Sequence, residues 1–339
     1  MKFGPVLVEQ AAGKILGHNL SAVDGRRGLR KGRRLDADDL TLLRLAGRNT
    51  VYVAELEQGD VPEDAAALRI ASALSGPGLS LSGPAAGRVN LRSDWLGVLR
   101  VAVTGLDSLN ELEGITLATL PSHSTIKPNQ IAGTVKVIPF ALSADLVRQA
   151  EELARDRGPL LRVEKLEPRK VGLILLATAG TRGRIETQFA PLKERIEALG
   201  SQLARIDHVD PAVDSAEREL ASALESQAKA GQDLIVLAGE SAIMDRADLA
   251  PRAAERIGGR VECVGAPVDP GNLLMLAYLG QVPVLGAPGC ARSRKLNIVD
   301  WVLPRLLAGE RLKRADIVAM GHGGLLEDQP ERPMPRSGI

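Results

Sequence analysis

The sequence is poor in aromatic residues. Phe, Trp and Tyr make up 2% of its 339 residues, so aliphatic side chains must fill the buried cores. Proteins that bind single-stranded nucleic acid by base stacking need aromatic platforms, and this composition argues against that class. The formal net charge of +1 supplies no overall attraction to nucleic acid or to an anionic membrane. We therefore expect neither as a partner.

Cysteines and long apolar segments are also scarce. The two cysteines, Cys263 and Cys290, are too few for a disulfide framework and lack the spacing of a zinc site. The N-terminal residues lack the apolar core of a signal peptide. No uncharged run approaches the roughly 18 residues of a membrane span. The four histidines are scattered, without metal-ligand spacing. We predict a cytoplasmic protein in which no histidine is catalytic.

The length and the pattern of the chain indicate several domains. A chain of 339 residues is expected to form two or three. Asp36 is expected to cap a helix that ends at Ala46. The basic, glycine-rich residues 25–34 favour a solvated hairpin over an anion-binding edge, because aspartates follow at once. The predicted segments are a small, clip-like α+β module (residues 1–76), a second α+β module (77–167), an α/β domain (168–320) and a tail (321–339).

Residues 168–320 have the pattern of an α/β domain. Residues 170–177 form a nearly continuous apolar run, as expected for a parallel strand buried on both faces. Alternating strands and helices predict βαβ units, a parallel sheet and a three-layer α/β/α fold. The further strands are predicted at residues 205–209, 233–238, 261–264 and 282–286, and the helices at 185–199, 211–230, 248–257, 271–279 and 296–307.

Glycine-containing loops follow three of these strands, at residues 178–184, 239–241 and 287–292. Ligands of open α/β sheets bind at the carboxyl ends of the strands, where small residues let backbone N–H groups approach an anion. Every strand-to-helix turn also favours small residues, so a purely structural role stays open. Pro270 and Gly271 are expected to form a type II turn or a helix start.

Asp245 and Asp248 follow the second of these loops. An exposed pair of carboxylates at a strand end can hold Mg²⁺ or accept hydrogen bonds from the amino groups of a heterocycle. The alternative is that either residue only caps the helix that runs to Ile257.

Three cations, Arg292, Arg294 and Lys295, follow the third loop at the predicted start of a helix. Positive charges there oppose the helix dipole unless an anion lies among them. This favours a phosphate ligand, and a solvated basic turn is the alternative. Cys290 lies in the same predicted pocket, where we expect a small loop residue rather than a reactive thiol.

Residues 234–241, 245–248, 268–272 and 284–291 resemble, in order and spacing, the molybdopterin-binding domain of molybdenum-cofactor biosynthesis proteins of the gephyrin kind. The resemblance implies a ligand phosphate beside the first or third loop, a pterin near Asp245 and Asp248, and a homodimer or homotrimer. The sequence departs from the family's pattern at two positions. Glu240 replaces the second glycine of the family's double glycine, and Ala291 replaces the second proline of its Pro-Gly-x-Pro loop. Binding is therefore better supported than adenylylation or molybdate insertion.

The resemblance and the loop chemistry together define the predicted site. Asp245 and Asp248 are the predicted catalytic and Mg²⁺-binding residues. The predicted cofactor-binding residues are Thr178, Gly180, Thr181, Gly239, Glu240, Ser241, Pro270, Gly271, Pro288, Gly289, Cys290 and Arg292.

The leading hypothesis is a protein that binds molybdopterin, or its nucleotide-activated form, in the assembly or delivery of the molybdenum cofactor. As an enzyme it would transfer a nucleotidyl group or insert the metal, with Asp245 or Asp248 holding Mg²⁺ and Arg292 or Arg294 neutralising phosphate charge. One alternative is a non-catalytic carrier or sensor that docks onto a molybdoenzyme or a cofactor-assembly protein. Another is an unrelated nucleotide-binding α/β protein.

Overall fold

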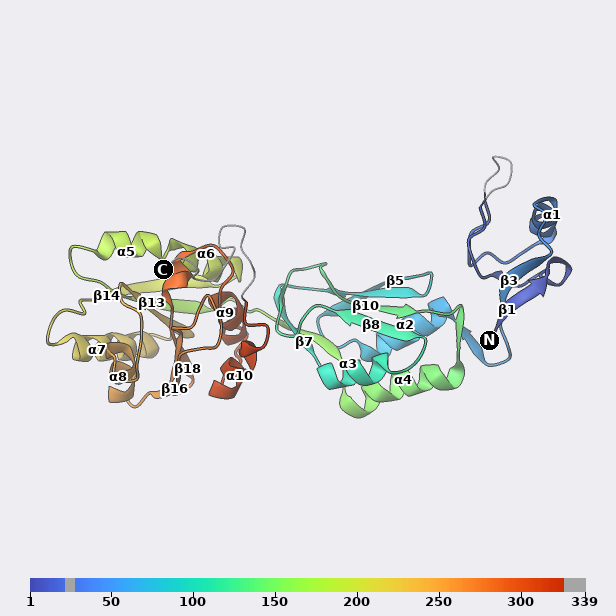
Figure 1. Ribbon diagram of the computed structural model, residues 1–339. Helices are drawn as coiled ribbons and strands as arrows, with labels where there is room; N and C mark the ends of the chain where they lie inside the picture. The colour runs from blue at the N-terminus through green and yellow to red at the C-terminus, as the bar shows by residue number, and fades with distance from the viewer. Residues whose placement is uncertain (22–27, 326–339) are drawn as a thin grey trace. The chain divides into compact units, whose positions relative to one another are not determined.

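A computed structural model of the chain describes residues 1–21 and 28–325 (Figure 1). Its contacts divide the chain into two units, residues 1–95 with 99–164 and residues 96–98 with those from 165 onward. Within the described ranges, no helix has the length and apolar content needed to cross a membrane. The predicted tail falls mostly outside the described residues, as does part of the predicted basic hairpin.

The first unit begins with a three-stranded antiparallel sheet, in the order β1-β3-β2. Its strands are β1 (Lys2–Leu7), β2 (Ile15–Leu16) and β3 (Thr50–Glu55), and they pack with α1 (Ala37–Leu45) around a core that includes Leu43 and Val53. The predicted cap of α1 is confirmed. Asp36 accepts a hydrogen bond from the backbone N–H of Asp39, and the Asp39 carboxylate accepts one from the N–H of Asp36.

A second core of the first unit is built around α2 (Glu63–Leu74). Ala66, Ile70 and Leu74 of this helix are fully buried, and they lie in one core with apolar residues of the strands between positions 79 and 163. The apolar face of α2 therefore packs against the residues that follow it in the chain. The expected module boundary at residue 76 is therefore displaced to a point before α2. The other helices are α3 (Val103–Asn110) and α4 (Ala144–Arg157). A four-stranded sheet contains, in this order, β5 (Leu79–Ala85), β6 (Arg88–Ser93), β10 (Ile131–Val137) and β8 (Ile115–Thr119). Two smaller sheets consist of β11 (Ala141–Ser143) with β4 (Asp60–Pro62), and of β12 (Leu161–Lys165), β7 (Gly97–Val101) and β9 (Thr125–Ile126).

The second unit contains a six-stranded sheet in the order β14-β13-β15-β18-β17-β16. The strands are β13 (Lys170–Leu176), β14 (Gln202–Val209), β15 (Leu234–Gly239), β16 (Arg260–Val264), β17 (Met275–Leu279) and β18 (Val282–Gly286). Its helices are α5 (Arg182–Gln188), α6 (Ala190–Ala198), α7 (Ala216–Lys229), α8 (Leu249–Arg256), α9 (Val299–Leu307) and α10 (Arg314–Val318). The short α10 was not expected from the sequence.

The sheet is mixed, because β17 runs antiparallel to both of its neighbours. The predicted helix at residues 271–279 is therefore wrong, and its second half is β17. A short run of buried apolar residues suits either a strand or a helix. Gly280 adopts φ +59° and joins β17 to β18 as a tight hairpin, which a helix would not allow.

Side chains of the central strands alternate between two cores on opposite faces of the sheet. Leu173 and Val236 point to the face that α5, α6, α9 and α10 cover, whereas Ile174 and Leu237 point to the face that α7 and α8 cover (Figure 1). The predicted three-layer α/β/α fold is confirmed.

Truncation of a central strand residue should destabilise this unit strongly. Leu237 is 1% exposed, so Leu237→Ala is expected to lower the free energy of unfolding by about 3 kcal/mol, through lost burial and the cavity left behind. Urea unfolding followed by circular dichroism measures the change. The control is Val318→Ala in α10, which is 55% exposed and should cost less than about 0.5 kcal/mol. Equal costs for the two variants would contradict this packing.

Candidate functional site

The predicted loops gather at one edge of the six-stranded sheet. Strands β13, β14, β15 and β18 run parallel, so the loops that follow them leave the sheet at the same edge. Met275, the first residue of β17, pairs with Gly286, the last of β18. The segment that contains Pro270 and Gly271 therefore reaches the same edge. The Pro270 carbonyl accepts a hydrogen bond from the N–H of Ile298 at 3.2 Å, which joins this segment to the start of α9.

Two arginines connect the loop after β15 to its neighbours. The Arg292 guanidinium donates to the carbonyl oxygens of Gly239 and, at 3.4 Å, Glu240. It also lies 5.0 Å from the ring centroid of Phe189, which follows α5. Arg184 of α5 pairs with the Glu240 carboxylate at 3.3 Å, but that pair is exposed and contributes little stability. The loops after β13, β15 and β18 thus form one connected rim.

The basic residues of the third loop lie differently from the prediction. The short 3-10 helix η2 (Gly289–Arg292) has Arg292 at its end, and α9 begins only at Val299. The cations therefore do not face the dipole of α9, and the electrostatic argument for a phosphate among them does not hold. Arg294 makes two hydrogen bonds to Glu194, one at 2.8 Å, and holds the pKa of that carboxyl below its usual value.

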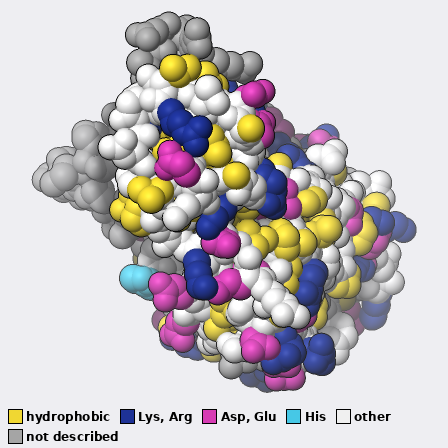
Figure 2. All heavy atoms as spheres, turned by 90° about the vertical axis from the view of Figure 1, so that its right-hand side faces the viewer, with side chains coloured by type: hydrophobic (Ala, Val, Ile, Leu, Met, Phe, Trp, Pro, Cys, Tyr) yellow, Lys and Arg dark blue, Asp and Glu magenta, His cyan; other side chains and the backbone are white. Residues whose placement is uncertain are grey.

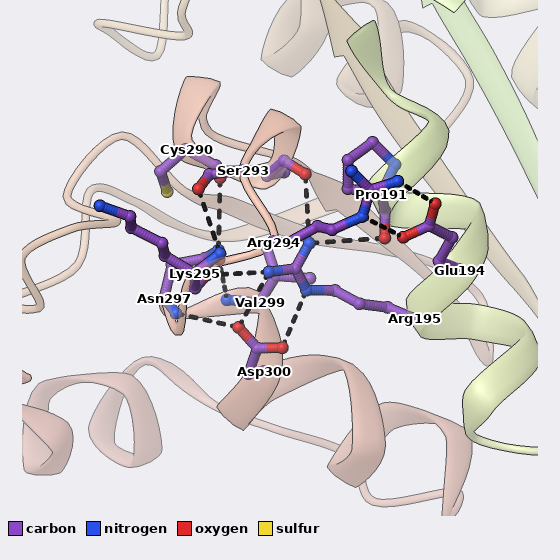
Figure 3. A network of polar contacts seen from close by, with 11 residues as sticks. Pro191, Glu194, Arg195, Cys290, Ser293, Arg294, Lys295, Asn297, Val299 and Asp300 are labelled. Atoms are coloured by element: carbon purple, nitrogen blue, oxygen red, sulfur yellow. Dashed lines mark hydrogen bonds and ion pairs between the residues drawn. The ribbon is translucent and has the colours of Figure 1, made fainter. Parts of the chain in front are cut away.

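Arg195 of α6 fixes this loop from outside (Figure 3). Its guanidinium pairs with Asp300 at 2.8 Å and donates to the carbonyl oxygens of Ala291 and Lys295 at 3.3 and 2.9 Å. Arg195 is 11% exposed, so its charge depends on these partners. Nothing in the sequence near residue 195 indicates this role, because its partners lie about a hundred positions away.

Asn297 completes the same network (Figure 3). It is 1% exposed, donates to the carbonyls of Cys290 and Lys295, and accepts from the N–H of Val299 at 3.0 Å. The backbone N–H of Asn297 donates to Asp300 at 2.9 Å. An asparagine just before a helix is a recognisable start signal, so the sequence did contain a clue to this residue.

The acidic pair organises its own turn. The Asp248 carboxylate accepts hydrogen bonds from the N–H groups of Met244 and Asp245, and the Asp245 carboxylate accepts from Ala247 at 2.8 Å. Asp248 is the residue before α8, but its side chain makes no capping hydrogen bond to that helix. In residues 1–21 and 28–325, no group of three or more His, Cys, Asp and Glu side chains could hold a metal ion. Catalytic and Mg²⁺-binding roles for the pair stay predictions.

Two predicted glycines are required by packing. A Cβ atom on Gly239 would lie 2.7 Å from the Cβ of Leu176. A Cβ on Gly271 would lie 2.3 Å from Ile298, and Gly271 also has φ +142°. The fold alone explains these two residues, so they say nothing about a ligand.

Three other glycines of the rim have no such explanation. Gly180, Gly183 and Gly289 have open space around the position of a Cβ atom, and none has a φ in the left-handed region. Gly4 in β1 shares these properties. Within the described part of the chain, the backbone N–H groups of Ala179, Gly180 and Gly289 donate no hydrogen bond to a backbone carbonyl. Small residues and available amides therefore coincide on the loops after β13 and β18.

Of the remaining predicted residues, Thr178, Thr181 and Pro288 make contacts within their own loops. The hydroxyls of Thr178 and Thr181 are 3.0 Å apart and fold the first loop back on itself. Pro288 is buried, and its carbonyl accepts from Ala291 at 2.9 Å. Ser241 is exposed. Burial raises the pKa of the Cys290 thiol to about 11, so this thiol is protonated at neutral pH.

Comparison with known proteins adds little to this geometry. A family model described as a domain of unknown function (DUF8806) matches residues 5–55. No curated protein matches the chain. A solved structure, the molybdopterin biosynthesis MoeA protein from Pyrococcus horikosii, is similar at 14% identity and a TM-score of 0.31, over 91% of this chain and 75% of that one.

The two classes of glycine should respond oppositely to substitution. Gly271→Ala is expected to lower the free energy of unfolding by more than about 2 kcal/mol, because of the clash with Ile298 and the strained φ. Gly289→Ala should leave stability unchanged or raise it by up to about 1 kcal/mol. Urea unfolding of both variants provides the measurement. A Gly289→Ala variant as unstable as Gly271→Ala would contradict the open surroundings of Gly289.

The Cys290 thiol should react slowly in the folded protein. With a pKa of about 11, roughly one thiol in a thousand is ionised at pH 8. Labelling by iodoacetamide, read by mass spectrometry of the Cys290 peptide, should be at least about tenfold slower than in urea. Because folding raises this pKa from 9.0, the associated stability is present below pH 9.0 and is lost as the pH rises towards 11. Equal labelling rates with and without urea would contradict the burial of the thiol.

Proposed function

We propose that this chain binds molybdopterin, or its nucleotide-activated form, at the rim of the six-stranded sheet, and acts in the assembly or delivery of the molybdenum cofactor. The observation that supports it best is the set of rim glycines, Gly180, Gly183 and Gly289, that neither packing nor backbone conformation requires. Glycine is selected where another molecule comes close to the backbone. The choice of molybdopterin as the ligand rests on the resemblance of residues 234–241 and 284–291 to the molybdopterin-binding family.

The loop amides and side chains suit the two ends of such a ligand. In this proposal the N–H groups of Ala179, Gly180 and Gly289 donate to the terminal phosphate. The Glu240 carboxylate and the Ser241 hydroxyl, both exposed, hydrogen-bond the amino and amide groups of the pterin. The network of Arg195 keeps the loop after β18 in place for this contact.

A carrier or sensor role is the second candidate, and the acidic pair favours it. Asp245 and Asp248 each use carboxylate oxygens to hold the turn between residues 244 and 248. A carboxylate committed to its own turn is a poorer Mg²⁺ ligand than a free one, because binding the ion competes with those hydrogen bonds. In this version the chain holds the pterin and passes it to a molybdoenzyme without turnover.

The proposal is tested by filling the open space at the rim. Gly180→Val and Gly289→Val should each lower the amount of pterin that copurifies with the full chain from a molybdopterin-producing host by about tenfold, equivalent to roughly 1.4 kcal/mol. The cause would be the side chain that now stands between the ligand and the backbone. Mass spectrometry of the released ligand, per mole of protein, measures the loss.

The matched control is Ala230→Val, which places the same valine side chain at an exposed position after α7, at the opposite edge of the sheet. This variant should retain pterin at the wild-type level, and thermal melting should show all three variants folded. The proposal is overturned if the wild type carries a free nucleotide and no pterin, or if Gly180→Val and Gly289→Val retain pterin as well as the control does.

A further inference from the structure

The N-terminal sheet has one covered and one open face. Val6 packs against the core beneath α1, while Phe3, Pro5 and Leu7 alternate with it along β1 and share the other face. Tyr52 of β3 lies opposite Pro5, and so belongs to the open face too. Phe3, Leu7 and Tyr52 are 48%, 50% and 48% exposed. Large apolar side chains thus cluster in solvent over two neighbouring strands.

Two of these side chains form an aromatic group with His18. The ring centroids of Phe3 and His18 are 5.7 Å apart, those of Phe3 and Tyr52 6.0 Å, and those of His18 and Tyr52 5.3 Å. The Phe3 ring rests on the backbone at Gly17, where a Cβ atom would lie 2.7 Å from it. In a chain that is only 2% aromatic, this exposed group serves no core.

The area and length of the open face limit the kind of molecule that it can bind. Three strands about 4.8 Å apart, with a longest strand of about 20 Å, present roughly 300 Å². A stable interface between proteins buries about 800 Å² on each partner, so this face alone does not supply the area of a stable dimer. An extended peptide of about six residues matches its length.

The edges of the sheet exclude the usual way of binding such a peptide. Pro5 removes a backbone N–H from β1, and β2 has only two residues, so neither edge can pair well with an added strand. Figure 2 shows basic and acidic side chains interspersed over the face it draws, with hydrophobic ones between them. A ligand of the open face would therefore be held by apolar contact with its side chains rather than by added strand pairing.

We propose that Phe3, Pro5, Leu7, His18 and Tyr52 bind an extended, proline-rich peptide of a partner protein. Proline rings pack against aromatic rings, and a polyproline II segment is already extended, so little conformational entropy is lost on binding. Such a peptide offers carbonyl oxygens but few N–H groups. The Tyr52 hydroxyl and the His18 imidazole supply the matching donors. This gives a role to the segment that the family model of unknown function covers.

A fluorescein-labelled oligoproline peptide of about nine residues is the probe, titrated with the full chain and followed by fluorescence anisotropy. Phe3→Ala and Tyr52→Ala should each weaken binding by about tenfold or more, because each removes a ring from the group. A glycine–serine peptide of equal length should not bind. Thermal melting shows that the variants are folded.

The control variant is Leu45→Ala, which removes an exposed apolar side chain at the end of α1 and should leave binding unchanged. The proposal is overturned by absence of oligoproline binding at millimolar concentration, or by equal binding to wild type and Tyr52→Ala. It is also overturned if sedimentation shows a wild-type dimer that Tyr52→Ala dissociates, because a second copy then covers the face. Retention of pterin should be unaffected by these variants, which separates this result from the test at the rim.

Discussion

The position of the loop after β18 depends on the ion pair between Arg195 and Asp300. Arg195 comes from α6, and besides Asp300 it holds two carbonyl oxygens of the loop. Both charges are largely shielded from water, so each needs the other to remain favourable in the fold. Gly289 and Arg292 keep their places beside the loop after β15 because this clamp holds the chain within η2, at Ala291, and just after it, at Lys295. The position of the rim loops therefore depends on contacts from helix α6 as well as on the strands that the loops follow.

The three-layer fold was predictable, since strands buried on both faces leave apolar runs that the sequence displays directly, as at residues 170–177. The antiparallel β17 was not. Met275 to Leu279 are nearly all buried, and buried residues carry no periodicity that separates a helix from a strand. The tight turn at Gly280 decides that these residues form a strand, but it can be identified as a hairpin turn only once β18 is known to pair with β17. The placement of α2 also escaped prediction, because pattern alone does not say which core an apolar face joins.

The place of the candidate site followed from the sequence, but the reasons for its residues did not. Loops that follow parallel strands must share an edge, so the rim could be predicted. Gly239 and Gly271 looked like ligand-approach residues, yet Leu176 and Ile298 require them. Asp245 and Asp248 looked like metal ligands, yet both fold their own turn. For the glycines, the distinction rests on neighbours in space that no local motif records. For the aspartates, it rests on hydrogen bonds to backbone N–H groups within four residues.

Arg292 touches more than the two carbonyls after β15. Its guanidinium also lies on Phe189, a buried ring between α5 and α6. A ligand that pulls the loop at Gly239 outward would draw this arginine with it and loosen the ring beneath. If a ligand binds at the sheet edge as proposed, Arg292 would transmit its occupancy to the α5–α6 junction, and the backbone amides of that junction would report it.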